Sequence, residues 1–133
     1  MLAYAQEKLF GPLGMTSVTW QTAADGSNTG GFGISMTPRD MLRFGYLYLN
    51  DGMWDGQRIL PEGWVEQSRP KEDTRKGYGY LFWGDKVDRT LGKSYAAKGM
   101  YGQVICVYPE KDLVVVRTGC GLFGRRGAVI PEE

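Results

Sequence analysis

The stretch "AAKGMYGQVICVYPEKDLVVVRTG", residues 96–119, predicts two antiparallel strands joined by a Pro-Glu-Lys-Asp turn. Apolar side chains occupy both odd and even positions of residues 103–108 and again of residues 113–116. Because successive side chains of a strand point to opposite faces, these strands belong in a sheet with a layer on each side. A glycine-bracketed step, residues 98–102, precedes them. From the residues alone this step is a bulge or a tight bend.

The clearest helix is predicted for residues 38–50, "PRDMLRFGYLYLN", where apolar residues recur at helical spacing. Thr37 is a suitable N-cap, and Pro38 would occupy the first helical position. Asp40 would lie in the first turn, where the helix dipole favours an acidic side chain. These signals agree on where this helix begins.

The remaining segments complete an α+β pattern. Residues 2–9 and 61–68 predict short helices, and the aromatic run "YGYLFW", residues 78–83, predicts a strand. A mostly helical part, residues 1–70, is thus followed by antiparallel strands within residues 78–118. We expect an antiparallel sheet with helices packed on it, in one domain of 133 residues.

The charge balance excludes several kinds of partner. Sixteen basic and 15 acidic residues give a net charge of +1, which provides no electrostatic case for binding nucleic acid or an anionic membrane. No apolar run reaches the ~20 residues that a membrane helix needs. The first ten residues, "MLAYAQEKLF", lack the basic region of a signal peptide, and the sequence gives no localisation.

The chain contains no histidine. This fact removes Ser-His-Asp and Cys-His catalysis together with histidine zinc sites, so the base of a hydrolase would have to be a group such as Lys or Tyr. Two cysteines, Cys106 and Cys120, are too few for a disulfide scaffold, and Cys106 fits a buried thiol. We expect no metal and no cofactor.

Two short patterns imitate catalytic motifs of serine hydrolases. Ser68 and Lys71 have Ser-x-x-Lys spacing, which works when both lie one turn apart at a buried helix start. Here Pro70 stands where the preceding helix should end, so we expect a loop. Tyr48 and Asn50 have Tyr-x-Asn spacing, but Tyr48 lies on the apolar stripe of its helix and is expected to be a core tyrosine.

Two further patterns follow the second strand. Residues 117–119, Arg-Thr-Gly, resemble a Lys-Thr-Gly motif but fall at the far end of the strand, where we expect them not to face a site beside the first strand. Residues 119–124 spell Gly-x-Gly-x-x-Gly, a dinucleotide-binding pattern that requires a following helix and an acidic residue about 20 positions on. Arg125 and Arg126 make a poor helix start, so a nucleotide site is the least favoured interpretation.

Four segments together resemble the β-lactamase-related serine hydrolases. This family includes class C β-lactamases, D-Ala-D-Ala peptidases, esterases and 6-aminohexanoate-oligomer hydrolases. The resemblance rests on residues 4–15 ("YAQEKLFGPLGM"), 30–68, 78–83 and 96–116, which follow the family's order and spacing. The "GMYGQ" step, residues 99–103, is most similar to the aminohexanoate-hydrolase and esterase branch.

The resemblance implies an active site between an all-α lobe and an α/β lobe. Residues 97–99, Ala-Lys-Gly, take the place of the family's Lys-Thr-Gly element and depart from it, since only the glycine is clearly retained. The resemblance implies that the Met100 backbone N–H contributes to an oxyanion hole and that Gly99 lets the substrate approach the strand edge. Lys98, Tyr101 and Gly102 are the expected substrate-binding residues. The side to which Lys98 points stays open.

In the family, the Ser-x-x-Lys element and the Tyr-x-Asn element precede the segment that residues 4–15 resemble. We therefore expect residues 1–133 to be a C-terminal fragment of a partial β-lactamase/transpeptidase-like fold that is inactive alone. The substrate of the intact enzyme would be a small ester, amide or β-lactam. The alternative is a non-catalytic or degenerate ligand-binding module. A missing C-terminal helix would leave one sheet face bare and favour self-association through the 103–116 hairpin.

Overall fold

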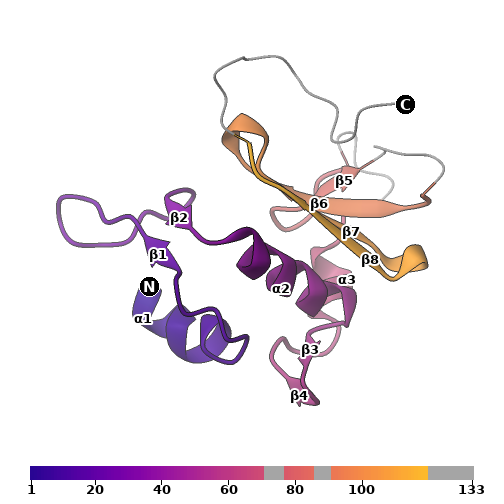
Figure 1. The fold of residues 1–133 in the computed structure, drawn as a ribbon, viewed down its shortest axis with the longest axis horizontal. Helices are drawn as coiled ribbons and strands as arrows, with labels where there is room; N and C mark the ends of the chain where they lie inside the picture. Colours follow the sequence, from indigo (N-terminus) through magenta and orange to yellow (C-terminus); the bar gives the residue numbers. More distant parts are fainter. Residues whose placement is uncertain (71–76, 86–90, 120–133) are drawn as a thin grey trace.

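The computed structural model describes residues 1–70, 77–85 and 91–119, and it has the expected α+β architecture (Figure 1). Its centre is a four-stranded antiparallel sheet in sequential order. The strands are β5 (Trp83–Asp85), β6 (Ser94–Lys98), β7 (Val104–Tyr108) and β8 (Leu113–Arg117). Ala96 pairs with Cys106, which pairs in turn with Val115. β6 and β7 therefore each have a neighbour on both sides, and the two apolar faces of β7 agree with its internal position.

Helix α2 (Pro38–Leu49) forms as the sequence predicts. The Thr37 hydroxyl accepts a hydrogen bond from the Asp40 N–H at 3.1 Å, and the Asp40 carboxylate accepts one from the Thr37 N–H at 3.4 Å. This reciprocal capping box satisfies two N–H groups that the first turn leaves without helical partners. The Asp40 carboxylate also accepts hydrogen bonds from the Arg43 guanidinium and the Ser17 hydroxyl. The bond from Ser17 ties the start of the helix to the preceding loop.

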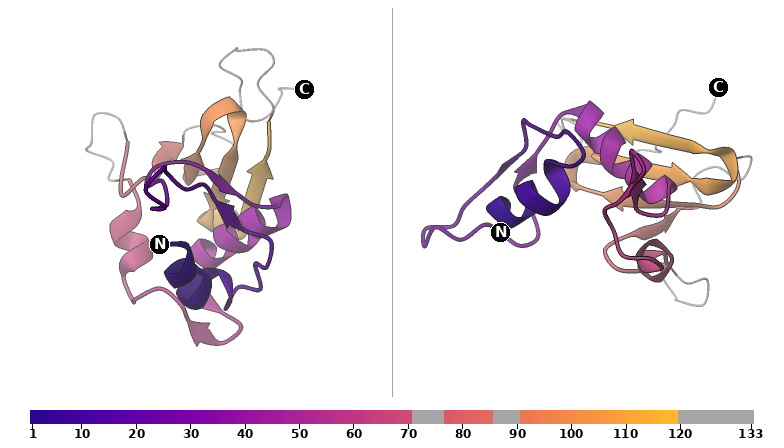
Figure 2. Two further views of the ribbon diagram at one scale, coloured as in Figure 1. Left: turned by 90° about the vertical axis from the view of Figure 1, so that its left-hand side faces the viewer. Right: turned by 90° about the horizontal axis from the view of Figure 1, so that it is seen from below.

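Helices α2 and α3 (Trp64–Ser68) cover one face of the sheet (Figure 2). α2 packs on β7 and β8. The buried side chains between the helices and the sheet are Tyr48, Val65, Phe82, Tyr95 and Val107. Three aromatic rings contact one another in turn. The ring centroids of Tyr48 and Phe82 lie 4.7 Å apart in a tilted arrangement, and those of Phe82 and Tyr95 lie 5.5 Å apart, edge to face.

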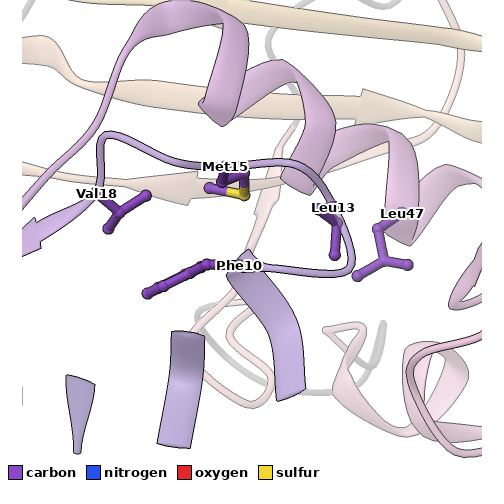
Figure 3. Close-up of a cluster of buried hydrophobic side chains, with 5 residues drawn as sticks. All are labelled: Phe10, Leu13, Met15, Val18 and Leu47. Atoms are coloured by element: carbon purple, nitrogen blue, oxygen red, sulfur yellow. The ribbon is translucent and has the colours of Figure 1, made fainter. Parts of the chain in front are cut away.

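The N-terminal helical segment packs on the side of α2 that faces away from the sheet (Figure 1). It consists of α1 (Leu2–Ala5) and a π-helical turn, η1 (Gln6–Phe10). A second core of five side chains joins this segment to α2; these are Phe10, Leu13, Met15, Val18 and Leu47 (Figure 3). Helix α2 thus lies between the sheet and the N-terminal segment, and it buries side chains in both directions.

The second face of the sheet is not bare. Ala96, Cys106 and Tyr108 are 0% exposed and Val104 is 5% exposed. Our expectation of a bare apolar face is therefore wrong. Self-association through the 103–116 hairpin stays a prediction.

The helix predicted for residues 2–9 is confirmed, and it ends in a π turn because the Gly11 N–H donates to the carbonyl of Gln6 five residues earlier. Two local predictions need correction. The strand expected over residues 78–83 is present only at its ends, where Tyr78 bridges to Trp83 and β5 begins. Residues 79–82 form a tight turn, in which the Gly79 N–H donates to the Phe82 carbonyl at 2.9 Å and Leu81 has a φ of +65°. Residues 61–68 are helical only from Trp64 onwards.

The described chain also contains two small hairpins and the turn between β7 and β8. β1 (Thr19–Trp20) pairs with β2 (Ile34–Ser35), and β3 (Met53–Trp54) pairs with β4 (Gln57–Arg58). The 3₁₀ turn η3 (Pro109–Lys111) is the predicted connection between β7 and β8. Within the described residues, no helix is long and apolar enough to cross a membrane.

Candidate active site

The glycine-bracketed step forms the connection between β6 and β7. The Gly99 N–H donates to the Gln103 carbonyl at 2.8 Å, which extends the β6–β7 ladder one residue pair beyond Lys98 and Val104. The chain then turns through a 3₁₀ element, η2 (Met100–Gly102). This turn lies at the end of the sheet, as the orange turn beyond β6 in Figure 1 shows.

Met100 and Tyr101 stand out from the end of the sheet. Their exposed fractions are 73% and 65%, which is unusual for large apolar side chains. Among the described residues, no backbone carbonyl accepts a hydrogen bond from the Met100 N–H. Gly99 just before it is extended, with φ −113° and ψ 171°. An exposed N–H at the end of a sheet strand can donate to a ligand that approaches the strand edge.

Two residues of the step have backbone conformations that L side chains rarely adopt. Tyr101 has φ +60° and ψ 22°, and Gly102 has φ +85°. A non-glycine residue in the left-handed region is strained, and such residues persist where the surrounding structure fixes them. The turn therefore keeps this conformation through contacts with neighbouring residues, and not through the intrinsic backbone preference of Tyr101.

Lys98 is the last residue of β6 and is exposed. Strand alternation puts Lys98 on the same face as Ala96, whereas Ala97 contacts the core beneath helices α2 and α3. Lys98 therefore belongs to the sheet face opposite these helices.

Residues 117–119 lie beside the glycine step, contrary to our prediction. Val104 pairs with Arg117, and a β-carbon on Gly102 would lie 3.4 Å from an Arg117 guanidinium nitrogen. The Gln103 side chain also hydrogen bonds the backbone of Gly119. In an antiparallel pair, the start of one strand lies beside the end of the next, and this rule could have identified the neighbourhood from sequence.

Ser68 and Tyr48, the first residues of the two patterns that imitate catalytic motifs, are both buried. Ser68 ends helix α3, is 1% exposed, and donates its hydroxyl to the Val65 carbonyl at 2.9 Å. Lys71 lies outside the described residues. Tyr48 is 7% exposed, and its hydroxyl accepts from the Trp64 indole at 3.4 Å. Burial raises the pKa of Tyr48, although its side-chain hydrogen bonds with Trp64 and Ser68 oppose the rise.

The described residues offer no metal site. Within residues 1–70, 77–85 and 91–119, no three His, Cys, Asp or Glu side chains gather closely enough to hold a metal ion. Cys106 is buried in β7, and Cys120 lies outside the described part of the chain, as does most of the Gly-x-Gly-x-x-Gly pattern.

Comparison with known proteins identifies the family. The profile of the family described as "Beta-lactamase" matches residues 1–119, which is most of the 133-residue chain. The chain belongs to the beta-lactamase family. No curated protein matches the chain. The family assignment confirms the resemblance carried by the four sequence segments.

Two solved structures have a similar fold. A "putative 6-aminohexanoate-dimer hydrolase" from Bacillus anthracis superposes with a TM-score of 0.72 at 24% identity. The match covers 87% of this chain and 31% of the hydrolase chain. A "putative beta-lactamase" from Bacteroides dorei DSM 17855 gives a TM-score of 0.63 at 20% identity. This match covers 86% of this chain and 43% of the other chain. The chain therefore spans about a third to two fifths of these structures.

Proposed function

We propose that this chain forms one wall of the active site of a serine hydrolase that cleaves an ester, amide or β-lactam bond through a seryl intermediate. The Met100 N–H donates to the oxyanion of the tetrahedral intermediate, and Gly99 lets the substrate approach the edge of β6. Lys98, Tyr101 and Gly102 border the bound substrate. The nucleophilic serine and its base come from polypeptide outside residues 1–133, and this chain alone does not turn over substrate.

The exposed Gly99–Met100 peptide is the observation that carries the proposal. Acyl transfer builds negative charge on the substrate oxygen, and a fixed backbone N–H stabilises that charge without rearranging during the reaction. The Gly99 N–H is engaged in the ladder, whereas the Met100 N–H has no backbone acceptor among the described residues. Two adjacent amides therefore have different roles, and only the second is available to a ligand.

Family membership supports this assignment. The beta-lactamase family acts on small amide and β-lactam substrates, and the two structural neighbours are described as a 6-aminohexanoate-dimer hydrolase and a beta-lactamase. An ester, amide or β-lactam substrate agrees with these names. The particular substrate depends on polypeptide that this chain does not include, because the chain covers 31% and 43% of the two neighbours.

A pair of substitutions at Met100 tests the proposal. Met100→Pro deletes the backbone N–H, and the extended Gly99 before it has the conformation that a residue preceding proline prefers. Met100→Ala keeps the N–H and removes the exposed side chain. Both variants are made in the longest polypeptide that the gene encodes, and hydrolysis of an activated ester is followed together with labelling by a fluorophosphonate.

We expect Met100→Pro to lower kcat by roughly 10²–10³-fold, the usual effect of losing one oxyanion donor, and Met100→Ala to leave kcat nearly unchanged. The labelled serine should lie outside residues 1–133. Equal rates for both variants would remove Met100 from the mechanism. A wild-type protein that binds the ester without labelling or hydrolysis would instead be the non-catalytic binding module.

A further inference from the structure

Gln103 connects three parts of the candidate site. Its backbone carbonyl accepts the hydrogen bond from Gly99, at the start of the glycine step. Its own position is the first after the 3₁₀ turn and immediately precedes β7. Its side chain reaches the neighbouring strand end at Gly119, which follows β8. Residues 16 positions apart in the sequence are thereby joined at the end of the sheet.

The side-chain amide of Gln103 engages both polar groups of one residue. The Gln103 Nε2 donates to the Gly119 carbonyl at 2.5 Å, and the Gly119 N–H donates to the Gln103 Oε1 at 3.3 Å. A primary amide is suited to this arrangement because it carries a donor and an acceptor side by side. The two hydrogen bonds close a ring and fix the orientation of the side chain.

Glycines allow the chain segments to approach this closely. A β-carbon on Gly119 would collide with the backbone carbonyl oxygen of Tyr101, and one on Gly99 would lie 3.1 Å from the Gln103 Cβ. The 3₁₀ turn is thus bounded by the Gln103 side chain on one side and by the Gly119 backbone on another. Tyr101, in its strained left-handed conformation, lies between these contacts.

We infer that Gln103 is the positioning residue of this site, and that its two side-chain hydrogen bonds with Gly119 fix the direction of the Met100 N–H. The inference rests on the function proposed above. Without these two hydrogen bonds, the turn loses a connection to the end of β8, and Tyr101 can relax from its strained conformation. The Met100 amide then samples several directions. An oxyanion donor is effective only when it is already oriented, so the chemical step slows while substrate binding is unaffected.

The test compares four proteins. Gln103→Met keeps the length of the side chain and removes both hydrogen bonds, and Gln103→Glu keeps the acceptor but sets a carboxylate against the Gly119 carbonyl. Gln57→Met is the matched control, since Gln57 is an exposed glutamine on the remote β3–β4 hairpin. Order parameters of the backbone amides are measured by ¹⁵N relaxation on the chain of residues 1–133.

We expect the order parameters of Met100 and Tyr101 to fall from about 0.85 to below about 0.6 in both Gln103 variants, with β6 and β7 unchanged. The Gln57→Met protein should match the wild type. Unchanged order at Met100 in Gln103→Met would overturn the inference. If that variant does not fold, Gln103→Glu decides the question by the same criterion.

A kinetic arm separates this inference from the proposed function. In the longest encoded polypeptide, Gln103→Met should lower kcat for an activated ester at least tenfold with KM within twofold of the wild type. A loosened turn with unchanged kcat would overturn the inference while leaving the hydrolase assignment in place. A wild-type protein without hydrolysis would refute the function, and the relaxation data would still decide whether Gln103 orders the turn.

Discussion

Gly45 of helix α2 lies directly against Val114 of strand β8. A β-carbon on Gly45 would be 2.5 Å from the Val114 Cγ1 and 2.8 Å from the Ile105 Cγ2. The helix therefore approaches the sheet closely at the point where β7 and β8 pair. This close packing fixes the helix relative to the strands that carry the glycine step.

Replacing Gly45 by alanine should destabilise the protein by about 1–3 kcal/mol, the usual cost of overpacking a core. This loss exceeds the gain of about 0.5–1 kcal/mol that alanine normally brings within a helix. Chemical denaturation measures the difference. Gly31→Ala is the control, since nothing lies within 4 Å of a β-carbon there. A Gly45→Ala protein as stable as the wild type would mean that helix and sheet are not in close contact.

Thr37→Ala should cost about 1 kcal/mol of folding free energy, because it removes the hydroxyl that accepts from the Asp40 N–H at the start of α2. The free energy of unfolding by urea is the measurement. Thr16→Ala, at an exposed threonine just before Ser17, should have almost no effect. Equal losses in the two variants would argue against the capping box.

Asp40 should make the protein sensitive to acid. Burial favours the neutral carboxyl, but hydrogen bonds from Thr37, Arg43 and Ser17 outweigh it and lower the pKa of Asp40 below 3.8. A lowered folded pKa gives stability that is fully present above 3.8 and is lost as the pH falls through the folded value. Asp40→Asn should therefore be less stable at neutral pH and lose less on acidification.

Tyr95 should govern stability at alkaline pH. It is 3% exposed, its hydroxyl donates to the Tyr48 carbonyl at 3.2 Å, and burial raises its pKa to about 12. A raised folded pKa gives stability that is complete below the unfolded value, about 10, and is lost as the pH rises towards 12. Between these two pH values, the melting temperature should fall less steeply with pH in Tyr95→Phe than in the wild type. Tyr4→Phe, at an exposed tyrosine, provides the comparison.

Ser68→Ala should leave hydrolysis and fluorophosphonate labelling of the longest encoded polypeptide unchanged. The Ser68 hydroxyl is buried and hydrogen bonded to Val65, so its loss should lower stability by about 0.5–1.5 kcal/mol. Mass spectrometry of the labelled peptide identifies the modified serine. Labelling at Ser68 would show that Ser68 and Lys71 form the catalytic pair after all.

Local signals were sufficient for the elements that depend on neighbouring residues. The capping residues of α2 and the Pro109–Lys111 turn follow from side chains close in sequence. The aromatic segment 78–83 was predicted only in part, because strand propensity could not reveal that Gly79 and Phe82 would close a turn.

The sequence by itself determined the α+β class, the central strand β7, the start of α2 and the family to which the chain belongs. Antiparallel pairing places residues 117–119 near the glycine step, but tertiary structure alone decided which side-chain contacts form there. The contacts of Gln103 with Gly119 and of Gly102 with Arg117 depend on the ends of β6, β7 and β8 meeting at one edge. Hydrophobic periodicity and capping act over a few residues, whereas these contacts arise only after strands far apart in the chain have paired.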